Sequence, residues 1–142
     1  MRIVVTGGAG YIGSVCVELL CSSGHDVLVI DNLGEGHRSA VDSRAVLEVR
    51  DLKESGALSD VLRDHRTEAV IHYAADALVG ESMSDPGKYY RNNLVGGLNL
   101  LESMVAAGVP RIVVSSTCAT YGAPARVPID EGCPQNPVSP YG

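Results

Sequence analysis

Tryptophan and phenylalanine are missing from this 142-residue sequence, and positive charge is scarce, with 11 Lys and Arg against 17 Asp and Glu. A formal charge of −6 with scattered basic residues lacks the electrostatic footprint of a nucleic-acid-binding protein, so we expect no nucleic-acid partner. No apolar run approaches the roughly 20 residues of a membrane span, and the N-terminus lacks the pattern of a signal peptide. We therefore expect a cytoplasmic protein without a membrane partner.

The four cysteines also lack the spacings that carry function. Cys16, Cys21, Cys118 and Cys133 form no CxxC pair and have no histidine at the distances of a metal motif. This pattern predicts reduced thiols and no metal site. Hydrophobic residues make up 45% and charged residues 20% of the chain, which excludes a disordered or fibrous protein and favours one globular domain.

Short β-branched runs alternate with helical patterns along most of the chain. The runs predict strands at residues 2–6, 27–30, 46–50, 68–73 and 111–116. Helices are predicted at residues 11–23, over a short segment that Ser55 would cap, and from Asp85-Pro86 to about residue 107. Such alternation predicts a doubly wound parallel α/β sheet with strand order 3-2-1-4-5. The proline-rich last 20 residues predict an extended loop.

The apolar positions of the two longer helices predict which faces pack on the sheet. In the first helix these positions are Ile12, Val15, Cys16, Leu19 and Leu20. In the long helix they are Leu94, Leu98, Leu101 and Val105. This arrangement leaves Tyr89, Val95 and Met104 as a separate apolar strip for a partner.

A glycine-rich turn joins the first strand to the first helix. Residues 6–13, TGGAGYIG, fit both G-x-G-x-x-G and G-x-x-G-x-x-G. Glycine permits the left-handed dihedrals of a tight turn, and a Cβ at Gly10 would hold the backbone away from a pyrophosphate. Gly13 lets the helix approach the sheet, and the helix N-terminus offers N–H groups to the phosphates. The turn follows a strand and opens a helix, so it predicts a dinucleotide site.

Asp31 ends the second strand, 18 residues after Gly13. A carboxylate at this position accepts hydrogen bonds from the adenosine ribose hydroxyls and repels a 2′-phosphate, which favours NAD over NADP. Two alternatives remain open at this point. Asp31 is an ordinary cap or loop residue in one of them, and in the other the nearby Arg38 holds a 2′-phosphate.

Further short motifs follow the expected strands and the long helix. They are Asp31-Asn32-Leu33, Asp51-Leu52, His72-Tyr73-Ala74-Ala75, Tyr90-Arg91-Asn92-Asn93, Ser115-Ser116-Thr117, Tyr121-Gly122 and Ser139-Pro140-Tyr141-Gly142. With the glycine turn, they resemble the extended short-chain dehydrogenase/reductase family, and within it the NAD-dependent epimerases and dehydratases of nucleotide sugars. The segment Val79-Gly80-Glu81-Ser82 favours the epimerases. The resemblance covers essentially the whole chain and implies one NAD-binding, Rossmann-like domain over residues 1–142.

The resemblance also implies which residues hold the NAD cofactor. They surround the pyrophosphate, the adenosine ribose, the adenine and the nicotinamide side in turn. The implied cofactor-binding residues are Gly7, Gly10, Tyr11, Ile12, Gly13, Asp31, Asn32, Leu33, Gly34, Glu35, Gly36, Asp51, Leu52, Tyr73, Ala74, Ala75, Asp76, Ala77 and Asn92. Position 77 departs from the family, because these epimerases often carry a lysine there.

Two residues are implied as catalytic. Tyr141 matches the tyrosine of the family's Tyr-x-x-x-Lys motif, and Thr117 matches its active-site Ser/Thr. A phenol with a pKa of about 10 is a poor base at neutral pH, so a lysine ammonium and the positive nicotinamide would have to favour the phenolate. Read without this resemblance, Tyr141 is a loop tyrosine and Thr117 caps the end of a strand.

The motif lysine would stand four residues after Tyr141, and the sequence ends before it. We therefore expect a truncated fold, an N-terminal portion that lacks the substrate-binding region and is inactive alone. The missing helix would also leave part of one sheet face bare.

The implied activity is that of an isomerase, the NAD-dependent interconversion of UDP-glucose and UDP-galactose. A C4 hydride is removed and returned through a 4-keto intermediate. Cys118-Ala119 stands where nucleotide-sugar dehydratases carry an acid pair, which argues against a dehydratase. Another epimerase or dehydratase of the family and a non-catalytic NAD-binding fragment remain alternatives. The implied partners are a UDP-sugar substrate and, at full length, a second copy in a homodimer.

Overall fold

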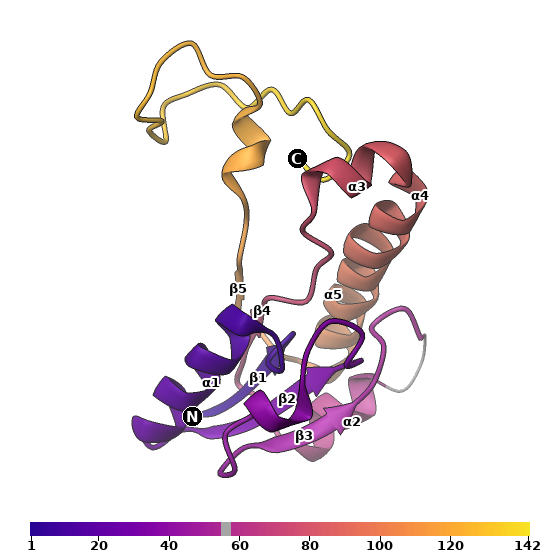
Figure 1. The fold of residues 1–142 in the computed structure, drawn as a ribbon. Coiled ribbons are helices and arrows are strands. Elements are labelled where there is room, and N and C mark those ends of the chain that lie inside the picture. Colours follow the sequence, from indigo (N-terminus) through magenta and orange to yellow (C-terminus); the bar gives the residue numbers. More distant parts are fainter. Residues whose placement is uncertain (55–57) are drawn as a thin grey trace.

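A five-stranded parallel sheet forms the centre of the molecule (Figure 1). The computed structural model describes residues 1–54 and 58–142, so the expected Ser55 cap lies outside the described residues. The strands are β1 (Arg2–Thr6), β2 (Asp26–Asp31), β3 (Val46–Val49), β4 (Ala69–His72) and β5 (Ile112–Val114). They pair in parallel in the order β3-β2-β1-β4-β5, which confirms the predicted doubly wound α/β topology.

Helices cover the two faces of the sheet. They are α1 (Tyr11–Ser22), α2 (Leu58–Asp64), α3 (Val79–Ser84), α4 (Pro86–Tyr89), the π-helical segment η2 (Tyr90–Val95) and α5 (Gly96–Ala107). Two short 3-10 turns are η1 (Arg38–Ala40) and η3 (Cys118–Tyr121). Within the described residues, no helix is both long enough and apolar enough to cross a membrane.

Alternate strand residues build two separate cores. Ile3, Val5, Val27 and Val29 pack with Val17 and Cys21 of α1 on one face. On the other face, Val4, Leu28, Ile30 and Val70 pack with residues of α2 and α5. Because both faces of β1 and β2 are covered, their central residues 3–5 and 27–30 are apolar at consecutive positions rather than at alternate ones.

The long helix begins and ends as its sequence predicts. The Asp85 side chain accepts a hydrogen bond from the Lys88 backbone N–H at 3.1 Å, and Pro86 occupies the first helical turn. The helix then runs through α4, η2 and α5 without a break in helical dihedrals, and it ends at Gly108 with φ of +72°. The short helix α3, which directly precedes it, was not predicted from the sequence.

The predicted apolar positions of α1 match its packing face only in part, since Leu20 packs against the core. The buried residues of α1 are Gly13, Val17 and Cys21, while Ile12, Val15 and Leu19 are at least half exposed. The buried positions are four residues apart and form one face of the helix. This face packs on the sheet because Gly13 has no side chain to hold the helix away.

The predicted faces of the long helix are wrong at every residue except Val95, which is exposed as expected. Gly96, Leu100 and Met104 pack inward, and Tyr89 is only 1% exposed. The opposite face carries an exposed apolar strip, here called the helix strip, formed by Tyr90, Leu94, Leu98, Leu101 and Val105. The inward face contains Gly96, where an added Cβ would lie 3.4 Å from the Leu52 side chain, so the helix approaches the loop after β3 closely.

The final segment leaves the sheet after β5 and passes through η3 into an irregular loop. Figure 1 shows the C-terminus beside α3, where the Tyr141 backbone N–H donates to the Ser82 hydroxyl at 3.3 Å. Val113 and Val114 of β5 are both more than half exposed. Part of the sheet is therefore bare among the described residues, as expected from the sequence.

Candidate functional site

A cavity of about 320 Å³ opens at the carboxyl ends of β1, β2, β3 and β4. In a doubly wound sheet, the crevice where the strand order reverses is the usual ligand site. The cavity wall combines the glycine turn, the loops after β2, β3 and β4, and the start of the long helix. It is lined by Gly7, Gly10, Ile30, Asp31, Asn32, Gly34, Glu35, Gly36, Arg50, Asp51, Leu52, Lys53, Tyr73, Ala74, Ala75, Asp76, Lys88 and Asn92.

The glycine turn is packed against its neighbours so closely that side chains would not fit. Gly7 has a φ of +72°, and a Cβ there would lie 2.6 Å from the Ala74 nitrogen of the loop after β4. A Cβ on Gly13 would lie 2.1 Å from the Gly7 carbonyl oxygen, so α1 rests directly on the turn. Gly7 is the turn's single left-handed residue, since Gly10 is extended with φ of −80°.

The N-terminus of α1 carries features of an anion site. Its first residue follows Gly10, no side chain caps it, and its first turn contains no acidic residue. The first N–H groups of a helix have no partner within the helix, and its dipole makes this end positive. The turn therefore offers backbone N–H groups to a phosphate at the cavity wall.

Asp31 joins the glycine turn to the loop after β2. One carboxylate oxygen accepts from the Ala9 N–H at 3.0 Å, and the other accepts from the Leu33 N–H at 2.8 Å. Leu33 has a left-handed φ of 58°, which this hydrogen bond supports. Asp31 is 8% exposed, and each of its carboxylate oxygens can accept a further hydrogen bond. Asp31 thus serves as a loop residue and still faces the cavity, whereas Arg38 is exposed and does not line it.

Polar side chains from three segments meet near the loop after β3. Asn32 donates to an Asp51 carboxylate oxygen at 3.2 Å, and the Lys53 ammonium lies 3.2 Å from the same oxygen. Lys53 also donates to the Asn92 side-chain oxygen at 3.3 Å. Partial burial acts to raise the pKa of Asp51, but the hydrogen bonds from Lys53 and Asn32 hold it below its ordinary value. Asp51 is therefore a carboxylate at neutral pH.

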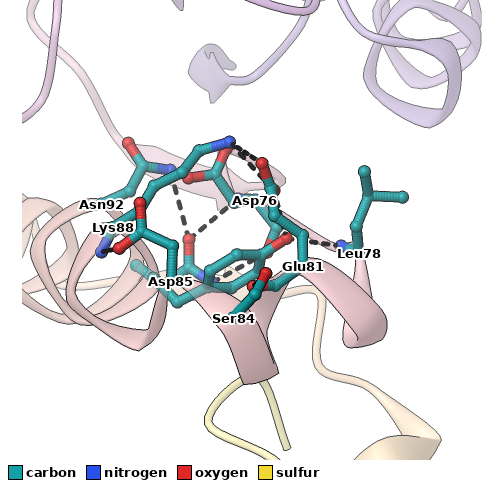
Figure 2. Close-up of polar contacts among 9 residues, drawn as sticks. Asp76, Leu78, Glu81, Ser84, Asp85, Lys88 and Asn92 are labelled. Atoms are coloured by element: carbon teal, nitrogen blue, oxygen red, sulfur yellow. Dashed lines mark hydrogen bonds and ion pairs between the residues drawn. The ribbon is translucent and has the colours of Figure 1, made fainter.

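The loop after β4 is clamped to the π-helical segment. The Asn93 side chain accepts from the Asp76 N–H at 2.8 Å and donates to the Asp76 carbonyl at 2.9 Å. Asn92, its neighbour, donates to the Asn93 side-chain oxygen at 3.2 Å and faces the cavity. Figure 2 shows Asp76 and Asn92 close together in this cluster.

A second polar cluster connects α3 with α4 (Figure 2). The Lys88 ammonium lies 2.8 Å and 2.9 Å from the two Glu81 carboxylate oxygens. The Tyr89 hydroxyl donates to Glu81 at 2.8 Å and accepts from the Leu78 N–H at 3.0 Å. The hydrogen bonds from Lys88 and Tyr89 hold the pKa of Glu81 below its ordinary value. Lys88 also lines the cavity, so this cluster begins at the cavity wall.

His72 is a partly buried residue at the carboxyl end of β4. Its Nδ1 lies 2.6 Å from the Thr6 hydroxyl on the neighbouring strand, and burial lowers its pKa. The ring is therefore neutral at pH 7 and is used for packing and hydrogen bonding.

The two residues implied as catalytic lie outside the cavity wall. The Thr117 hydroxyl oxygen accepts from the Ala119 N–H at 3.1 Å and so caps η3. Tyr141 packs edge-on against Tyr89, with ring centroids 6.2 Å apart. A Cβ on Gly142 would lie 2.5 Å from the Ala119 carbonyl oxygen, so the segment that carries Tyr141 contacts the turn that Thr117 caps.

Comparison with known proteins agrees with this geometry. The model of the NAD dependent epimerase/dehydratase family matches residues 3–142. The chain belongs to this family. A UDP-glucose 4-epimerase from Lacticaseibacillus casei is 50% identical over 142 residues, and one from Lactobacillus helveticus is 49% identical. Each match covers all of this chain and 43% of the relative, so the chain spans less than half the length of these relatives.

Solved structures of the family have the same fold. The crystal structure of a UDP-glucose 4-epimerase from Brucella ovis in complex with NAD is 44% identical, with a TM-score of 0.95. The match covers 99% of this chain and 43% of that one. The UDP-glucose 4-epimerase of Thermus thermophilus in complex with NAD gives a TM-score of 0.93 at 42% identity, and the match covers 99% of this chain and 46% of that one.

Most of the residues that the resemblance implies as cofactor-binding line the cavity. Five of the implied residues do not, namely Tyr11, Ile12, Gly13, Leu33 and Ala77. Tyr11 and Ile12 begin α1 with exposed side chains, and only their backbone is near the turn. Gly13 instead supports the turn from inside the fold.

Four lining residues were not predicted from the sequence, namely Ile30, Arg50, Lys53 and Lys88. Spacing offered a signal for two of them. Lys53 follows Asp51 by two residues. Lys88 precedes Asn92 by four residues, about one helical turn, so Lys88 and Asn92 lie on the same face of the long helix.

Proposed function

We propose that this chain is the NAD-binding domain of a nucleotide-sugar 4-epimerase, and that the complete protein interconverts UDP-glucose and UDP-galactose. The observation that carries this proposal is the meeting of an uncapped helix N-terminus and a buried carboxylate, Asp31, at one cavity. These are the groups that a dinucleotide's pyrophosphate and ribose require. The names of the relatives and the NAD in the Brucella ovis structure support it.

The residues present fit NAD. A Cβ on Gly7 or Gly13 would collide with backbone, so the turn keeps the bare amide surface that a pyrophosphate needs. The Asp31 carboxylate is suited to the ribose hydroxyls and disfavours a 2′-phosphate. Asp51 and Leu52 are suited to the adenine side, and Asn92, which also lines the cavity, is suited to a polar contact with the cofactor. We therefore assign NAD rather than NADP to this cavity.

Bound NAD would supply a reversible hydride acceptor for C4 of the sugar. The proposed role of Tyr141 is to remove and return the proton of the sugar 4-hydroxyl. Thr117 is suited to hold that hydroxyl, because its oxygen already accepts from Ala119 and its own hydrogen is left to donate. The segment that carries Tyr141 contacts the turn that Thr117 caps, which supports a shared site for the acid–base group and the positioning group.

We also propose that the complete protein is a homodimer and that the helix strip is part of the interface. All five residues of the strip are apolar or aromatic, and each is at least 46% exposed. Contiguous apolar patches of this kind on soluble proteins usually mark an interaction site.

The test is an assay of the complete gene product that carries this sequence. We expect UDP-galactose to be converted to UDP-glucose with no net reduction of NAD. Tyr141→Phe should lower turnover at least about 100-fold, as expected for loss of a general base, while Glu102→Gln, at an exposed position of α5 outside the helix strip, serves as the control. Steady reduction of NAD or release of a 4-keto-6-deoxy sugar would refute the epimerase assignment. Binding of NAD without turnover would indicate a non-catalytic module.

A further inference from the structure

Tyr89 is a buried tyrosine with both hydrogen-bonding capacities of its hydroxyl in use. The side chain is 1% exposed, and its hydroxyl donates to Glu81 and accepts from the Leu78 N–H. A phenylalanine would fill the same space without the cost of burying a hydroxyl. The hydroxyl therefore fixes the position of the ring in a way that apolar packing alone does not require.

The ring that is fixed in this way contacts Tyr141. The two rings meet edge to face, with centroids 6.2 Å apart and planes at 74°. This is a favoured geometry for aromatic pairs, because the positive edge of one ring faces the negative face of the other. Tyr89 therefore constrains the side chain of Tyr141 from one side.

The backbone of Tyr141 is held by a second residue of the same region. Ser82 of α3 is fully buried, and its hydroxyl accepts from the Tyr141 N–H at 3.3 Å while donating to the Val79 carbonyl at 2.7 Å. Ser82 and Glu81 are neighbours, so one short helix contacts Tyr141 directly and also secures Tyr89. Glu81 in turn holds Lys88, which lines the cofactor cavity (Figure 2).

We infer that Tyr89 and Ser82 are positioning residues for Tyr141, which hold its phenol at the reaction centre through contacts anchored by Glu81. This inference rests on the proposed catalytic role of Tyr141. In this arrangement Tyr89 touches neither substrate nor cofactor and acts through the position of another side chain. The segment Val79-Gly80-Glu81-Ser82 is then part of the support of the active site.

The experiment compares Tyr89→Phe with Glu102→Gln in the complete gene product, at a temperature where circular dichroism finds each variant folded. Glu102 lies on the same long helix, is exposed, belongs to neither the cavity nor the helix strip, and serves as the control. Because small displacements of a reacting group cost large factors in rate, Tyr89→Phe should lower kcat at least about tenfold and leave KM for UDP-galactose within about twofold. Glu102→Gln should change neither constant. An unchanged kcat in Tyr89→Phe, even with a lower Tm, would overturn the inference and leave Tyr89 a packing residue.

Two further variants separate this inference from the proposed function. Ser82→Ala removes the acceptor of the Tyr141 N–H without altering Tyr89, and it should also lower kcat at constant KM. In a Tyr141→Phe background, Tyr89→Phe and Ser82→Ala should have no further effect on residual turnover, because all three changes act on one group. Additive effects in that background would overturn the inference. Full activity of Tyr141→Phe alone would instead refute the proposed role of Tyr141.

Discussion

Replacement of Gly13 by alanine should destabilise the glycine turn, because the new side chain of α1 would clash with the backbone of the turn. The added Cβ would lie 2.1 Å from the Gly7 carbonyl oxygen and 2.9 Å from the Gly8 Cα, whereas real Cβ atoms stay beyond 3.0 Å. These neighbours are backbone atoms, so no side chain can rotate away, and α1 must move by about 0.9 Å. Overpacking of this kind costs about 3 kcal/mol at the upper end of the usual range. For a domain of this size we expect Tm to fall by about 9 °C.

Thermal unfolding followed by circular dichroism measures this effect, and Gly97→Ala is the matched control. Gly97 also lies in a helix, and nothing stands within 4 Å of a Cβ added there. Alanine at Gly97 should therefore stabilise the protein by about 0.5–1 kcal/mol through better helix propensity. Calorimetry should also find that Gly13→Ala loses NAD binding while Gly97→Ala keeps it. Equal shifts of Tm in the same direction for both variants would refute the packing argument.

Two further predictions concern pH and association. Burial holds the pKa of His72 below its ordinary value of 6.5. As the pH falls, His72 therefore binds a proton in the unfolded chain before it does so in the folded chain. The free energy of unfolding should consequently decrease as the pH falls below about 6.5. The variant His72→Asn keeps a hydrogen-bond partner for the Thr6 hydroxyl but has no group that titrates in this range. Between about pH 7.5 and about pH 5.5, its Tm should decrease less than the Tm of the unmodified protein. The same decrease in both proteins would contradict this account. Leu98→Glu on the helix strip should convert a dimer of the complete gene product to a monomer in sedimentation velocity at micromolar concentration, and a native protein that is already monomeric would refute the proposed interface.

The sheet could be predicted from the sequence because its signals are local. Runs such as residues 2–6 and 27–30 are apolar on both faces, and each ends at a turn residue or an acid. The order of the strands then follows from the handedness and shortness of their connections. By contrast, α3 has six residues, too few to form a helix by propensity alone, and it depends on tertiary contacts such as the burial of Ser82.

The packing faces of the helices could not be predicted from hydrophobicity. Both α1 and the long helix are apolar on more than one face, so the larger side chains suggested the wrong one. Gly13 and Gly96 decided the outcome, because a small residue lets a helix approach its neighbour and the face around it becomes buried. At Gly13 and Gly96, close packing around the small residue was therefore a better guide to the inward face than the number of large apolar side chains, although Gly97 faces open space.

The residues of the candidate site could be predicted where they belong to a sequence motif. They could not be predicted where they reach the cavity through contacts between different helices and loops. Asp31 and Asp51 follow strands whose carboxyl ends must meet at one edge of the sheet. Lys53 and Lys88 reach the cavity through ion pairs with Asp51 and Glu81, and these pairs exist only in the folded chain.

The number of residues between Asp85 and Gly96, which include the π-helical segment η2, sets the orientation of α5 relative to α4. A helix turns by about 100° per residue, and the wider π turn shifts the angular phase of α5 relative to α4. Tyr89 before this segment and Leu100 after it are both buried, although the segment between them is not regular α-helix. Loss of a single residue from η2 would rotate α5 against α4 by about a quarter turn. The helix strip would then swing toward the sheet, and Asn92 away from the cavity.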